Sequence, residues 1–213
     1  MSDFNKVQNW KMKVLDQKKN EKSITMNCQM AGKKNEDGSY PTVNIRVMIL
    51  PDPDGIHDTK CDWEHKDLTG KTIVVDGSFK TDEWKRGNNT MLVMIVFADR
   101  IREYVHDEEH PIQTNICNLN MVVLEEKTTN KGNRYFTCSK SSGKNEDGTY
   151  KKSMFLNVFA SKDYELPKEM VKKSVDVEGT FSISEYKKED GTKVTNFTIF
   201  ATEVKEHIWE KKA

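Results

Sequence analysis

The sequence lacks the marks of an exported or membrane-embedded protein. Its 213 residues contain no run of 18 apolar residues, so no membrane-spanning segment is predicted. The segment Met1–Lys6 has none of the apolar stretch that a signal peptide carries. The four cysteines lie far apart and include no Cys-x-x-Cys pair, which argues against a disulfide framework. We therefore expect a protein of the reducing cytoplasm.

Sequence signatures of catalysis are also missing. The chain contains no GxxxxGK[ST] phosphate loop, no GxSxG and no HExxH. One spacing that is typical of metal ligands, His57-x₃-Cys61-x₃-His65, is present. On a straight helix its two histidines would lie about 12 Å apart, too far for all three side chains to hold one zinc ion. We expect no enzymatic activity, no cofactor and no bound metal.

Charge of either sign is not in excess, because 34 Lys and Arg balance 34 Asp and Glu. The balance is uneven along the chain: +4 over residues 1–50, −6 over 51–110, +3 over 111–160 and −1 over 161–213. Apolar residues make up only 35% of the chain, which favours small units over one large core. The alternation of charge indicates a duplicated unit.

Four ordered sequence matches support a duplication. Asn9, Met12, Val14 and Leu15 return as Asn118, Met121, Val123 and Leu124. The other three pair Lys34–Tyr40 with Lys144–Tyr150, Val75–Phe79 with Val177–Phe181, and Val96–Ala98 with Ile199–Ala201. The offsets of 109, 110, 102 and 103 change only where loops differ in length. We therefore predict two domains, 1–106 and 112–213, joined at the polar, proline-ended segment His106–Pro111.

Each unit has the alternation of apolar and polar residues that is typical of short β-strands. The expected strands are 12–15, 24–30, 43–49, 73–79 and 91–97 in the first unit, and 119–126, 133–140, 153–160, 174–184 and 194–204 in the second. Between the third and fourth strands we expect an irregular or briefly helical stretch, 51–70 in the first unit and a short helix at Lys168–Lys173 in the second. This order predicts an all-β chain of two tandem OB-folds, five-stranded Greek-key barrels, with a generic β-sandwich as the alternative.

The second and third strands of an OB-fold carry the usual oligonucleotide face. In the second unit, alternation places Phe136, Cys138, Met154, Leu156 and Val158 inside the barrel. We assign Tyr135, Phe155, Phe159, Arg134 and Asn157 to the outer face, where the rings offer stacking surfaces for bases. The alternative is a dimer or interdomain interface, since interfaces also favour aromatic residues.

The same face of the first unit is polar, and Arg46 is its candidate contact. That unit instead has a fifth strand, Met91–Phe97, that is apolar on both sides, which indicates burial against another unit or under the N-terminal segment. Basic residues gather in the loops beside aromatic rings, a combination that suits a single nucleic-acid strand. The candidate loop residues are Lys33, Lys34, Trp84, Lys85, Arg86, Tyr186, Lys187 and Lys188.

Segments 75–103 and 177–206 resemble the C-terminal half of the OB domain in single-stranded DNA-binding proteins. The shared features are a strand that ends in Asp/Glu-Gly-x-Phe, a following aromatic residue (Trp84, Tyr186), a basic turn and a long last strand. The resemblance implies non-enzymatic binding of single-stranded DNA in replication, recombination or repair. It also implies a homodimer, because many members assemble four OB domains.

One feature departs from that family. Bacterial members commonly end in an acidic tail that recruits partners, whereas this chain ends Glu206–Ala213 without one, as a phage-like version would. Two other functions remain open at this point. One is RNA binding, since OB-folds serve both polymers, and the other is a protein–protein adaptor of the replication machinery that uses the same aromatic face.

Overall fold

The computed structural model describes residues 5–20, 23–50, 66–86, 89–109, 111–164, 166 and 168–208. The His57-x₃-Cys61-x₃-His65 spacing and most of the expected irregular stretch 51–70 lie outside these residues. No helix in the described part of the chain is long and apolar enough to cross a membrane.

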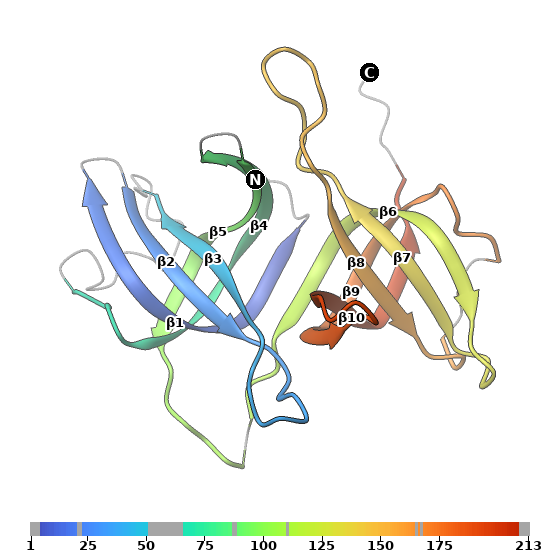
Figure 1. The fold of residues 1–213 in the computed structure, drawn as a ribbon, viewed down its shortest axis with the longest axis horizontal. Helices are drawn as coiled ribbons and strands as arrows, with labels where there is room; N and C mark the ends of the chain where they lie inside the picture. Colours follow the sequence, from blue (N-terminus) through green and yellow to red (C-terminus); the bar gives the residue numbers. More distant parts are fainter. Residues whose placement is uncertain are drawn as a thin grey trace.

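Within the described residues the fold has ten β-strands, which divide into two sets of five. Figure 1 shows the two sets side by side. The first set is β1 (Lys6–Asn20), β2 (Ser23–Ala31), β3 (Thr42–Ile49), β4 (Thr72–Arg86) and β5 (Asn89–Glu103). The second set is β6 (Asn115–Thr128), β7 (Arg134–Lys140), β8 (Met154–Ala160), β9 (Ser174–Lys187) and β10 (Lys193–Glu206).

Each set closes into a barrel. In the first barrel β1 pairs with β2 and β4, β2 with β3, β3 with β5 in parallel, and β5 with β4. The second barrel repeats this order with β6 to β10, including the parallel pair of β8 and β10. This connectivity is that of the OB-fold, so the predicted tandem of Greek-key barrels is confirmed.

The expected strands are all present, and most extend further than predicted. β1 begins at Lys6, and β4 continues to Arg86 through its pairing with β5. The short helix expected at Lys168–Lys173 is wrong. A turn at Val171–Lys172 takes its place, in which Lys172 has a φ of 66° and its N–H bonds to the carbonyl of Val123.

The buried side chains of both barrels form one continuous cluster. The second unit's expected inward set, Phe136, Cys138, Met154, Leu156 and Val158, is confirmed as buried. In β5 the consecutive residues Met94, Ile95 and Val96 are all buried, whereas Met91 is 52% exposed. The two-sided burial expected of this strand therefore holds in its middle and not at its start.

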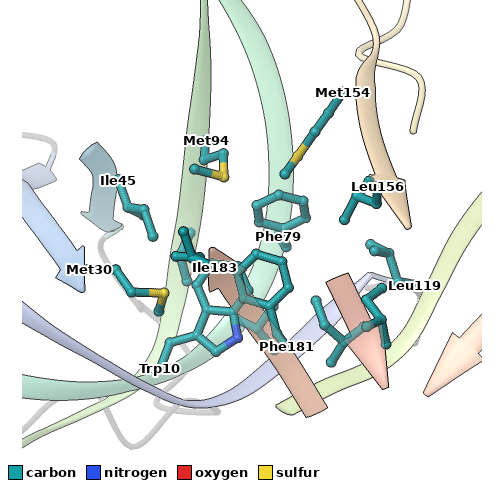
Figure 2. Close-up of a cluster of buried hydrophobic side chains, with 14 of the residues drawn as sticks. Trp10, Met30, Ile45, Phe79, Met94, Leu119, Met154, Leu156, Phe181 and Ile183 are labelled. Atoms are coloured by element: carbon teal, nitrogen blue, oxygen red, sulfur yellow. The ribbon is translucent and has the colours of Figure 1, made fainter. Parts of the chain in front are cut away.

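Trp10 joins the two barrels at the centre of the cluster (Figure 2). Its indole is fully buried and stacks on Phe181 of the second barrel, with 5.0 Å between ring centroids and an interplanar angle of 10°. Phe79 of its own barrel lies 5.3 Å away, and the indole N–H donates to the carbonyl of Asn115 across the junction at 3.0 Å. Trp10 therefore packs against both its own barrel and the other unit.

Strands β1 and β6 also pair directly, through Lys6 with Cys117, Val7 with Ile116, and Gln8 with Asn115. The repeat offset of 109 in this region exchanges the pairs Lys6–Cys117 and Gln8–Asn115 and returns the pair Val7–Ile116 to itself. The contact is therefore isologous, with an approximate two-fold axis between Val7 and Ile116, as in a symmetric dimer.

Candidate nucleic-acid interface

The outer face of the second barrel carries three aromatic rings in a row across three strands. Tyr135 on β7 lies opposite Phe159 on β8, and Phe159 lies beside Phe200 on β10 in the parallel pair. Neighbours in register point to the same side of a sheet, so the three rings share one face. We call Tyr135, Phe159 and Phe200 the aromatic ladder.

The ladder is accessible to a ligand. Phe200 is 50% exposed, and its ring meets Phe159 edge-on at 6.0 Å. Phe155, two outward positions from Phe159 along β8, is 61% exposed. Flat rings in a row on an exposed sheet are the surface on which successive bases stack.

Phe200 was not among the residues predicted from the sequence. Its signal is the alternation of the last strand, where Ile199 and Ala201 are buried and Phe200 between them is exposed. The backbones of β9 and β10 approach each other closely at Phe200. A Cβ on Gly179 would lie 2.2 Å from the Phe200 carbonyl oxygen, so only glycine fits there.

Two other predicted face residues are engaged within the protein. The guanidinium of Arg134 forms an ion pair with Glu126 at 2.6 Å and lies over the Phe136 ring, and its side chain is only 16% exposed. Arg134 is two residues from Phe136 and therefore points toward the barrel end, contrary to the outer-face assignment. The Asn157 amide lies on the outer face, where it donates to the Asn196 side chain on β10.

The first barrel has the same face with different chemistry. The positions that correspond to the ladder are Thr25, Met48 and Phe97, which are again neighbours in register. Arg46 lies on this face between Asn27 and Ile95 and is partly exposed. With one ring in place of three, the first barrel offers less stacking surface than the second.

The predicted loop residues lie around the hairpins and loops that flank these faces. Trp84 and Tyr186 occupy equivalent positions near the ends of β4 and β9 and are about half exposed. Lys85 and Arg86 end β4, and their side chains lie outside the described part of the structure. Lys187 ends β9, and Lys188 begins the turn to β10, where its N–H bonds to the Thr192 carbonyl. Lys33 and Lys34 lie in the loop after β2.

Tyr186 lies near the ladder. Burial raises the pKa of the Tyr135 phenol above its ordinary value, and the neighbouring Tyr186 raises that pKa further. The two phenols are thus within electrostatic range of each other, although β7 and β9 are not adjacent strands.

The comparisons with known proteins found similarity in structure and not in sequence. No family model matches the chain, and no curated protein matches it significantly. A crystal structure of a deletion mutant of the single-stranded DNA binding protein from Thermus aquaticus is 15% identical, with a TM-score of 0.51 over 98% of this chain and 97% of that chain. The wild-type Thermus aquaticus protein is 16% identical, with a TM-score of 0.48 over 99% and 96% of the two chains. The first of these likenesses shows a shared fold along the whole chain.

Proposed function

We propose that this protein binds single-stranded DNA without sequence preference and without catalysis. The aromatic ladder carries the proposal, because three partly exposed rings in register form a stacking platform on the strands where OB-folds bind oligonucleotides. The Thermus aquaticus structure of the same fold comes from a single-stranded DNA binding protein, which supports the choice of ligand.

The proposal extends to the setting of this activity. We assign the two domains to residues 1–106 and 112–213 and the role to DNA replication, recombination or repair. The assembly would be a homodimer with four OB domains. RNA is the competing polymer, and binding of a ribo-oligonucleotide in the same assay measures the preference.

The test is the fluorescence anisotropy of an end-labelled oligo-dT of about 25 nucleotides, longer than the 4–16 that one OB-fold covers. Measurements at about 50 and 200 mM salt separate phosphate contacts from stacking, because only the former depend strongly on salt. Replacing the whole ladder by alanine removes three stacks of about 1–3 kcal/mol each, so affinity should fall at least about 100-fold.

The first barrel provides the matched control. The control variant carries Thr25→Ala, Met48→Ala and Phe97→Ala at the corresponding positions. The factor by which its affinity falls should be less than a tenth of the factor for the ladder variant. Circular dichroism checks that both variants remain folded. Undiminished affinity in the folded ladder variant would refute the assigned face. Absence of binding by the wild-type protein, with a concentration-dependent oligomer that the ladder substitutions abolish, would favour the adaptor function instead.

A further inference from the structure

The approximate two-fold axis creates two equivalent contacts between the barrels. The loop after β2 (residues 32–41, here the first loop) lies against the β9–β10 hairpin of the second barrel. The loop after β7 (residues 141–153, the second loop) lies against β4 and β5 of the first barrel. Both loops contain the repeated motif Lys-Asn-Glu-Asp-Gly-Ser/Thr-Tyr, and Figure 1 shows them on opposite sides of the junction.

The contact of the second loop is closed by polar interactions. The buried hydroxyls of Thr81 and Ser142 share a hydrogen bond of 2.7 Å. Lys151 forms an ion pair with Asp82, and the Lys152 ammonium donates to the Thr90 carbonyl at 3.0 Å. These bonds seal the second loop onto the first barrel.

The contact of the first loop is open. Among the described residues, one backbone hydrogen bond crosses it, from the Lys33 N–H to the Ile183 carbonyl at 2.7 Å, and Asp37 of the loop attracts Lys193 of the hairpin. Beyond that bond lies a groove with a volume of about 540 Å³. Its walls are Lys33–Asp37 of the first loop and Ser184–Lys187 with Lys193 of the hairpin, and we call it the crossing groove.

The sequence explains why one contact closes and the other does not. The offsets of the repeat place Pro41 where the second loop has Lys151, and Ser184 where the first barrel has Asp82. Neither Pro41 nor Ser184 carries a charge, so these two positions do not repeat the ion pair of Lys151 and Asp82. Gly32 and Ile183 likewise replace the hydroxyl pair, and a Cβ on Gly32 would lie 2.3 Å from the Ile183 carbonyl oxygen.

The lining of the crossing groove holds four lysines and three carboxylates, Glu36, Asp37 and Glu185. Glu185 and Asp37 both attract Lys193. Among the described residues, no carboxylate forms an ion pair with Lys33, Lys34 or Lys187, whereas Lys193 is paired with Glu185 at 2.9 Å. Tyr186 adds a ring that is 52% exposed. Unpaired ammonium groups beside an exposed ring match the alternation of phosphate and base along a single strand.

We propose that the crossing groove carries the strand between the two barrels, with Lys33, Lys34 and Lys187 on its phosphates and Tyr186 against a base. This proposal rests on the proposed function. It adds a path: one continuous strand leaves the ladder of the second barrel and passes the first loop to reach the first barrel. Only the open side of the junction carries that strand.

Two oligo-dT lengths test the path. One of about 6 nucleotides is short enough to occupy the ladder alone, and one of about 25 nucleotides is long enough to cross the junction. Each phosphate contact with a single strand contributes about 0.7 to the slope of log affinity against log salt. Lys34→Ala with Lys187→Ala should therefore reduce the slope for the long strand by about 1.4 and weaken its binding at low salt by roughly tenfold.

The matched control is Lys144→Ala, because Lys144 occupies the position of Lys34 in the repeated motif but lies at the closed contact. It should bind both lengths like the wild-type protein, and Lys34→Ala alone should weaken binding of the long strand only. The path would be overturned if Lys34→Ala and Lys144→Ala weakened binding of the long strand equally. It would also be overturned if the double variant bound the long strand like the wild-type protein. In both cases binding at the ladder would persist. Wild-type protein that binds neither length would instead refute the proposed function itself.

Discussion

Trp10→Ala should destabilise the whole chain more than any substitution within one barrel. Replacing a fully buried tryptophan by alanine costs about 3–5 kcal/mol in free energy of unfolding. The loss includes two ring pairs of about 0.5–1.5 kcal/mol each, with Phe181 and Phe79, and the hydrogen bond to Asn115 of about 1 kcal/mol. For a chain with about 5–15 kcal/mol of total stability, this is about a fifth or more.

Urea unfolding followed by circular dichroism measures this loss. Trp10→Phe keeps a ring on Phe181 and removes the N–H donor, so it should cost only about 1–2 kcal/mol. A double-mutant cycle with Phe181→Ala should return a coupling of about 0.5–1.5 kcal/mol between the barrels. A loss below about 1 kcal/mol for Trp10→Ala, or a coupling of zero, would refute the view that this ring joins the two barrels.

Three further predictions follow from particular side chains. Phe200→Ala should weaken oligo-dT binding by about 5- to 150-fold in a titration. Phe97→Ala, at the equivalent position of the first barrel, should weaken it much less. Equal losses would contradict the difference in stacking surface between the two barrels. Burial raises the pKa of Cys28 and Cys138 to about 12, so a thiol reagent near neutral pH should modify them only on unfolding, and rapid labelling of the native protein would disprove their burial. The hydrogen bond from Lys151 lowers the pKa of Asp82, with a smaller contribution from Lys80. Because the folded pKa is depressed, this stabilisation is present above the ordinary value of 3.8 and is lost as the pH falls through the folded value. Asp82→Asn should therefore lower stability in urea at neutral pH and leave it unchanged in strong acid, and a loss of equal size in strong acid would contradict this assignment.

The sequence was sufficient to predict the fold because the signals involved are local. Alternation marks the inward faces, through Ile24, Met26 and Cys28 in the first unit and Phe136 and Cys138 in the second. The repeat predicts the number of barrels. Tyr135 and Phe159 were placed correctly on the outer face for the same reason.

The remaining features depend on pairs that are distant in the chain. Phe200 joins the ladder through the parallel pairing of β8 and β10, which no turn between neighbouring strands specifies. Trp10 is buried against Phe181, 171 positions away. Arg134 is the exception, because its two-residue spacing from Phe136 already indicates the inward face. The difference between the two junction contacts depends on Pro41 and Ser184, whose roles emerge only when the barrels are placed together.

The axis between Val7 and Ile116 has a consequence for any ligand that has a direction. A two-fold rotation reverses the sense in which a path runs over a surface, whereas a DNA strand runs from 5′ to 3′ throughout its length. A strand that continues from one barrel to the other meets the second face in the polarity opposite to the first. Identical side chains on the two faces would then meet differently oriented sugars and bases. A strand bound in this way therefore does not require the same side chains on the two faces. The second barrel has three rings on its face, and the first barrel has one.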